Sequence, residues 1–292
     1  MYYLLSLLAG MLISVMVVFN GGLNGRVGQT AALVIIHLAG LVFILLLMLI
    51  KGEKLRLKRL PFYLYLGGLL GIMTTVFNNT AFGHISVSAM MALGLLGESV
   101  SSLLADHFGL LGLPKRPFRR QKLWGGLLAL AGVVFMWDDF QLIPVIVCLR
   151  AGVTVLISRL INGRQAAHSG LLGSTLINYA VGLTGSLLLL LFTGSGQSVS
   201  FAMSGPFYIY LGGVMGGVIV LISSFCVGKI PSFYMTLALF LGQVLAGVLL
   251  DMVLAQAFPM NSLIGGLFVL GGLSVNLTLD HAYEKKNAPQ VS

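Results

Sequence analysis

The chain has 292 residues, of which 58% are hydrophobic and only 9% are charged, and its formal net charge is +9. Soluble domains carry a charge on about a quarter of their residues, so this composition excludes a water-covered surface and indicates an integral protein of the lipid bilayer. The basic residues cluster in short segments between apolar runs, as juxtamembrane topology signals do, which argues against a nucleic-acid partner.

The apolar runs predict an all-α integral membrane protein with ten transmembrane helices. One crossing needs about 20 apolar residues, and two stretches without Asp, Glu, Lys or Arg, 60–97 and 165–228, are too long for a single crossing each. The predicted spans are 2–20, 30–50, 62–80, 85–106, 121–137, 142–161, 169–193, 206–227, 232–255 and 260–279.

With the exception of Arg26, the loops between these spans alternate in charge. Lys and Arg gather in the segments 51–59 and 115–122, between spans two and three and between spans four and five. The loops after spans seven and nine carry neither residue. Because cytoplasmic loops are enriched in Lys and Arg, we expect a multi-pass chain with both termini in the cytoplasm.

The second half of the chain repeats the first. The segment 62–68, FYLYLGG, matches 207–213, FYIYLGG, and at the same offset Gly97 meets Gly242 and Asp106 meets Asp251. Upstream, Asn24-Gly25-Arg26 is matched with Asn162-Gly163-Arg164. We therefore expect two five-helix repeats, residues 1–139 and 140–292.

Five is an odd number of crossings, so the second repeat must enter the membrane upside down relative to the first. Inverted repeats are a recurrent design of secondary transporters, because two similar halves that face opposite sides can exchange conformations. With both repeats in one chain, we expect a functional monomer, with a homodimer as the alternative.

Several segments resemble a known family: the Asn-rich end of span one, Leu96-Gly97-Glu98, the segment 106–112 (DHFGLLG), and Leu241-Gly242-Gln243 with Asp251. They resemble the drug/metabolite transporter superfamily, and more closely its YdcZ-like branch. The resemblance covers nearly the whole chain. It implies a ten-helix carrier of the bacterial plasma (inner) membrane that moves small metabolites or toxic compounds, often outward. The second copy departs from the pattern after Asp251, and the first has Glu98 where the second has Gln243.

Glu98 is the strongest candidate for chemistry. It lies inside span four, and Ser101 and Ser102 follow on the same helix face. A carboxylate at that depth costs roughly 2.5–3.5 kcal/mol on insertion scales, so it must face a cavity, pair with a cation or be protonated. It is therefore expected to bind a cationic substrate or to exchange a proton for it, the alternative being a structural ion pair within the bundle.

Span six contains two arginines, nine residues apart and so on opposite helix faces. Arg159 is expected to snorkel to the cytoplasmic edge. Arg150 is the deeper one and the better candidate to pair with Glu98 or with an anionic substrate, in which case the substrate would be anionic or zwitterionic.

Other polar residues inside the spans are candidates for substrate contacts or for hydrogen bonds between helices. These are Asn20, Asn24, Asn78, Asn79, Gln243 and His37. His37 is expected more as a structural residue, since a lone histidine on an apolar helix is usually satisfied by a neighbour. Asp106 and Asp251, both near helix ends, are expected to fix those ends or to cap neighbouring helices.

No enzyme motif occurs in the chain, and neither a cofactor nor a metal ion is expected. The favoured function is a secondary transporter, an exporter of a small organic metabolite or drug, driven by an ion gradient with protons as the candidate ion. The alternative is a non-catalytic membrane component or a channel-like facilitator.

Overall fold

The computed structural model describes residues 1–54, 60–109, 122–135, 142–193, 205–226, 232–255 and 260–287. This part of the chain forms ten α-helices, at the ten places that the sequence predicts. They are α1 (Tyr2–Val27), α2 (Gln29–Lys51), α3 (Gly67–Ala81), α4 (Val87–Phe108), α5 (Lys122–Phe135), α6 (Leu142–Ser169), α7 (Leu171–Phe192), α8 (Gly212–Cys226), α9 (Ser232–Ala255) and α10 (Met260–Asn287). Two short 3-10 helices, η1 (Phe62–Tyr65) and η3 (Phe207–Leu211), precede α3 and α8. The two basic segments, 51–59 and 115–122, fall largely outside the described residues.

Five of the described helices are long and apolar enough to cross a bilayer: α1, α2, α4, α6 and α7. Shorter apolar stretches of 10–17 residues lie in 123–132, 207–223, 238–254 and 264–276. In a helix, every interior backbone group is paired within its own segment, which is what a segment surrounded by lipid requires.

Three helices extend further than the hydropathy predicts: α10 reaches Asn287 rather than residue 279, and α1 and α6 show where such helices end. α1 reaches Val27 rather than residue 20, and α6 reaches Ser169 rather than residue 161. Each ends at a glycine with a positive φ, Gly28 at 80° and Gly170 at 76°, where a side chain would be strained. Hydropathy marks where the apolar segment ends, whereas the backbone hydrogen bonds continue to the next residue that breaks the helix.

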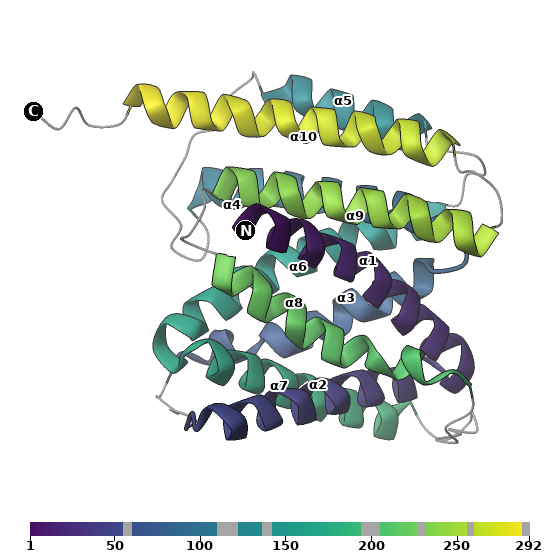
Figure 1. The fold of residues 1–292 in the computed structure, drawn as a ribbon, viewed down its shortest axis with the longest axis vertical. Coiled ribbons are helices and arrows are strands. Elements are labelled where there is room, and N and C mark those ends of the chain that lie inside the picture. Colours follow the sequence, from purple (N-terminus) through teal and green to yellow (C-terminus); the bar gives the residue numbers. More distant parts are fainter. Residues whose placement is uncertain are drawn as a thin grey trace, which may run out of the picture.

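The helices form layers that lie across the view in Figure 1. α5 and α10 pack side by side at one edge, and α2 and α7 pack together at the opposite edge. α1, α3, α4, α6, α8 and α9 lie between them and cross one another. The residues that the sequence singles out as site candidates are therefore carried mainly by the central helices.

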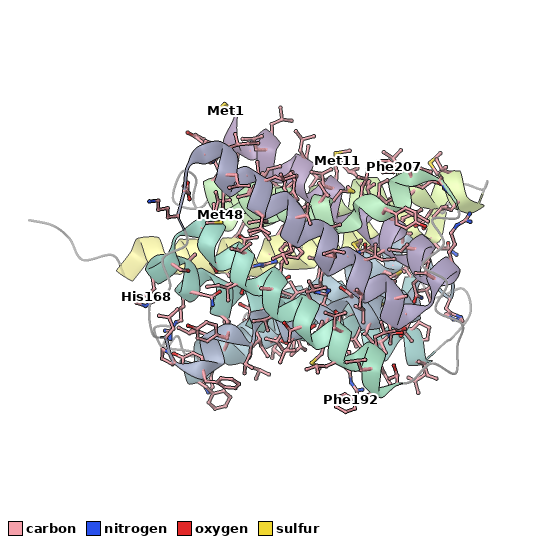
Figure 2. All side chains as sticks on the ribbon, turned by 90° about the horizontal axis from the view of Figure 1, so that it is seen from below. Met1, Met11, Met48, His168, Phe192 and Phe207 are labelled. Carbon is pink, nitrogen blue, oxygen red and sulfur yellow. The ribbon has the colours of Figure 1, made fainter. Side chains whose placement is uncertain are left out.

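The ends of the helices gather at two faces of the molecule. Figure 2 shows Met1, Met48 and His168 toward one end and Phe192 and Phe207 toward the other. The first face, where α1 begins and α6 ends, is called the N-terminal face below, and the opposite one the far face. The start of α1 and the end of α10 lie toward the same side in Figure 1, as expected from an even number of crossings.

The two halves make equivalent contacts through glycines. α1 crosses α9 and α4 crosses α6 at points where a Cβ would overlap the backbone of the partner helix. The overlaps are Gly10 with Leu239, Gly242 with Leu7, Gly152 with Gly94, and Gly97 with Leu149. Corresponding positions of α4 and α9 therefore differ by 145 residues, as Gly97 and Gly242 do, which is the offset that the sequence predicts. Corresponding positions of α1 and α6 differ by 142 residues, as Gly10 and Gly152 do.

The second offset corrects the sequence alignment of the first helix of each half. The structural counterpart of Asn162 is Asn20, not Asn24: Asn20 packs its Oδ1 against Gly212, and Asn162 packs its Oδ1 against Gly67. The segment around Asn20 contains two Asn-Gly pairs one helical turn apart, and a shared arginine favoured the wrong one. The packing of Asn20 against the start of α8, which matches that of Asn162 against the start of α3, decides between the two Asn-Gly pairs.

Candidate functional site

Glu98 and Arg159 form an ion pair between α4 and α6. Arg159 donates from Nη1 to Oε1 of Glu98, and from Nη2 to Oε2 at 3.4 Å. The glycine crossing at Gly97 and Gly152 brings the two helices close enough for this contact. Gly152 and Arg159 are seven residues apart, two helical turns, so both lie on the side of α6 that faces α4.

This pairing corrects the role expected for Arg150. Arg150 is exposed and has no ion-pair partner among the described residues, whereas Arg159, expected at the cytoplasmic edge, holds the carboxylate. The two arginines point to opposite faces of α6, as the sequence indicates. Depth alone could not select between them, because the rotation of α6 about its axis is set by its contact with α4.

Ser101 and Ser102 share the Glu98 face of α4 and are half-buried. The Ser101 hydroxyl donates to the carbonyl oxygen of Gly97 at 2.7 Å, so it is occupied by its own helix. No described side chain is hydrogen-bonded to the Ser102 hydroxyl. Ser102 is therefore the member of this group best able to bind something else.

The other half has no counterpart of the ion pair. The counterpart of Glu98 is Gln243, buried in α9, whose backbone carbonyl accepts a 2.8 Å hydrogen bond from Ser14. The counterpart of Arg159 at the offset of 142 is Val17. The charged centre is thus present once in the chain.

The faces of α1 and α6 that correspond to each other are packed differently. Val17 is 3% exposed in a core with Ala81 and Val87, and a Cβ at Gly21 would overlap the ring of Phe82. In α6 the Arg159 side chain is 55% exposed, and a Cβ at Gly163 would meet no described atom within 4 Å. The face of α1 around Val17, toward the far face of the molecule, is therefore closed. The corresponding face of α6 around Arg159, toward the N-terminal face, is open.

α6 also carries a row of polar side chains that faces α3 and α7. We call Thr154, Ser158, Asn162, Gln165 and Ser169 the polar seam. Thr154 and Thr74 share a 2.7 Å hydrogen bond, Ser158 donates to the Gly67 carbonyl at 3.2 Å, and Ser174 donates to Gln165 Oε1 at 3.1 Å. The signal for this row in the sequence is a set of polar residues that repeat every three or four positions along α6.

The α1 positions that correspond to the seam are apolar except for Asn20: Leu12, Met16, Leu23 and Val27. Asn20 is 6% exposed, and its Oδ1, like that of Asn162, has no hydrogen-bond partner among the described residues. Each of these oxygens instead lies against the glycine that begins α8 or α3. The two glycines, Gly212 and Gly67, therefore allow their helices to approach Asn20 and Asn162 closely.

The remaining candidate amides are separate from the ion pair. Asn79 is buried in α3, and its Oδ1 and Nδ2 have no partner in the described part of the chain. Asn78 is half-buried beside it, and its carbonyl accepts from the Phe82 amide. Asn24 is half-buried near the end of α1, where its carbonyl accepts from the Gly28 amide.

His37 lies at the interface of α2 and α7. Its Nδ1 is 2.8 Å from the Leu33 carbonyl oxygen and 3.2 Å from Ser186 Oγ. The edge of its ring faces Tyr179, its repeat counterpart at the offset of 142, whose hydroxyl donates to the Gly213 carbonyl at 2.9 Å. These contacts join three helices and do not involve Glu98.

Asp251 caps α4, which confirms the role expected for it. Its carboxylate accepts from the amides of Val87 and Ser88 at 2.6 and 2.9 Å and from the Ser88 hydroxyl at 2.5 Å. These donors are unpaired in the first turn of any helix, and a negative charge there is also favoured by the helix dipole. The cap fastens the end of α9 to the start of α4. The side chain of Asp106 lies outside the described residues.

An all-α chain in which five described helices are long and apolar enough to cross a bilayer is typical of a multi-pass membrane protein. Comparison with family models identifies the family: residues 1–135 and 143–275 each match the one described as "Putative inner membrane exporter, YdcZ". The chain belongs to the YdcZ family of the drug/metabolite transporter superfamily, and the double match confirms the resemblance and the fused copies. This is a family of transporters rather than enzymes.

The fold is similar to that of a solved structure described as "Crystal structure of protein". The TM-score is 0.63 and the identity 19%, with 95% of this chain and 97% of the other covered. At this identity the likeness concerns the fold alone. Comparison with curated proteins gives no match.

Proposed function

We propose that the protein is a secondary transporter that exports a small organic metabolite or drug by alternating access, driven by an ion gradient. In this proposal its ten helices span the inner membrane as two inverted five-helix units, residues 1–139 and 140–292. Both termini are cytoplasmic, and the chain is sufficient as a monomer. Membership of an exporter family supports the class and direction.

The observation that carries this proposal is the difference between two corresponding faces. In α1, Val17 is packed against α3 and α4 and Gly21 against Phe82, which follows α3, while Arg159 and Gly163 in α6 are open. Two repeats in different packing states are what an inverted-repeat carrier has when it is open to one side only. Exchanging the two packing states would close the N-terminal face and open the far face.

The direction of transport fits this arrangement. If the N-terminal face is cytoplasmic, as the basic loops indicate, the open side is where an exporter takes up its substrate. At the far face, the core around Val17 and the Asp251 cap close the path. Glu98 lies on the open side near the middle of α4, where it can take part in binding or in proton coupling.

The experiment uses purified protein in proteoliposomes. The vesicles are given an extract of bacterial metabolites with and without a pH gradient, and the solutes that they accumulate are identified by mass spectrometry. A transporter accumulates a few solutes, saturates with concentration and shows counterflow of a labelled solute. Flux that never saturates and shows no counterflow would indicate a channel-like facilitator instead of a carrier. The absence of any protein-dependent flux would indicate a non-catalytic membrane component.

A further inference from the structure

We infer that the substrate is a small zwitterion with adjacent ammonium and carboxylate groups, of the amino-acid type, which binds between Glu98 and Arg159. This inference rests on the proposed function and specifies its substrate class. It starts from the fact that these two side chains form an ion pair near the middle of two central helices.

The first step concerns charge balance. Glu98 and Arg159 neutralise each other, and no other described ion pair involves either of them. An anion that took Arg159 would leave the Glu98 carboxylate, whose side chain is only 13% exposed, without its cation, which is strongly unfavourable. A cation that took Glu98 would leave the more exposed guanidinium without its carboxylate, which costs less free energy but still loses the ion pair. A zwitterion presents an opposite charge to each partner at once, so no charge is left alone.

The second step concerns access. The Arg159 side chain is 55% exposed, whereas that of Glu98 is 13% exposed. A guanidinium has five N–H donors in a planar fork, and Glu98 occupies two of its nitrogens on one side only. The remaining donors match a ligand carboxylate, and the ligand ammonium is then directed toward Glu98.

The third step concerns what the open surface is. The corresponding face of α1 belongs to the interior core around Val17 and Phe82 rather than to the outer surface of the bundle. By the repeat, the face with Arg159 and Gly163 also points inward, toward the path between the halves. The Ser102 hydroxyl, which is not hydrogen-bonded to any described side chain, lies one turn from Glu98 on the same face of α4 and can form a further hydrogen bond with the ligand.

The test compares three charge forms of one side chain. Alanine, leucine and phenylalanine are each used as the free amino acid, the methyl ester and the N-acetyl derivative, and their binding to the purified protein is measured by equilibrium dialysis. For at least one side chain, the zwitterion is expected to bind about tenfold or more tightly than either charged form. Equal or tighter binding of the ester or the acetyl form overturns the inference, as does binding of none of the nine while the protein carries another solute.

Variants assign the effect to the pair. Glu98→Gln should shift the preference toward the N-acetyl form, and Arg159→Gln toward the ester, each by about tenfold. Arg150→Gln, on the opposite face of α6, is the matched control and should change nothing. If a single variant does not fold, the neutral double variant Glu98→Gln with Arg159→Gln replaces it and should bind the three forms alike. A double variant that keeps the zwitterion preference overturns the inference, while saturable transport in proteoliposomes would still support the proposed function.

Discussion

Asp251 is a buried carboxylate whose role is fixed by donors from another helix. It is 5% exposed, and its two oxygens accept two backbone amides and one hydroxyl at the start of α4. A carboxylate in apolar surroundings is stabilised only when such partners compensate for the water it has lost. Glu98 obtains the same compensation from a cation instead. Each of the two acidic groups is thus tied to one specific contact between central helices.

Replacing Asp251 by Ala should lower the stability of the folded protein. The amides of Val87 and Ser88 would lose a charged acceptor in a buried place, a loss of about 1–3 kcal/mol. Thermal unfolding of the purified protein measures this, and Asp251→Asn, which retains one acceptor oxygen, should lose less. An unchanged unfolding temperature for the Ala variant would contradict the cap.

Replacing Glu98 by Gln should abolish proton-coupled transport in proteoliposomes while the protein still folds. The amide cannot release a proton and no longer compensates Arg159, whose exposed side chain can remain hydrated in the opening. Uptake driven by a pH gradient is the measurement, with Arg150→Gln as the control. Full activity of the Glu98 variant would remove this residue from the coupling mechanism.

At the scale of helices, glycines decide which elements touch. α5 and α10 approach through Gly125 and Gly132, where a Cβ would overlap the backbone at Gly272 and Gly265. Without a hydrophobic driving force in lipid, such close contact is a main source of helix association. The same device holds α1 to α9 and α4 to α6, and it thereby orients the helix that carries Arg159.

Adjacent glycines in α5 give a matched test of this packing. Gly125→Val should destabilise the protein by about 1–3 kcal/mol, because the side chain would overlap α10. Gly126→Val should be tolerated, since a Cβ there meets no described atom within 4 Å. The two unfolding temperatures are compared, and equal values would exclude the glycine contact as a determinant of the α5–α10 pair.

Across the whole molecule, the two halves share a plan and differ in chemistry. The α6 half has the ion pair and the polar seam, whereas the corresponding α1 positions are mostly apolar. In the proposed carrier, the exposed Arg159 would bind the solute, and the apolar face around Val17 would exclude water. Under the same proposal, this difference would make the two ends of the transport cycle unequal.

Thiol labelling tests which face is open. In a background with the buried Cys148 and Cys226 replaced, Gly163→Cys should react quickly with a membrane-impermeant maleimide applied at the N-terminal face. Gly21→Cys should be protected by Phe82. Faster labelling at residue 21 than at residue 163 would reverse the assignment of the open face.

The sequence alone determined the environment, the number and places of the helices, and the family. These depend on local properties: the scarcity of charge, runs of apolar residues about as long as a bilayer is thick, and short motifs. It also identified Glu98 as a carboxylate that needs compensation, since the cost of burying a charge does not depend on the fold.

Only the tertiary structure decided what Glu98 contacts. The sequence pointed to Arg150 and shifted the repeat of the first helix by one turn, because composition does not fix the rotation of a helix about its own axis. Contacts between glycines and backbone far apart in the chain fix that rotation, as at Gly152 against Gly94. They present Arg159 to Glu98, and they leave one of two corresponding faces open and the other closed.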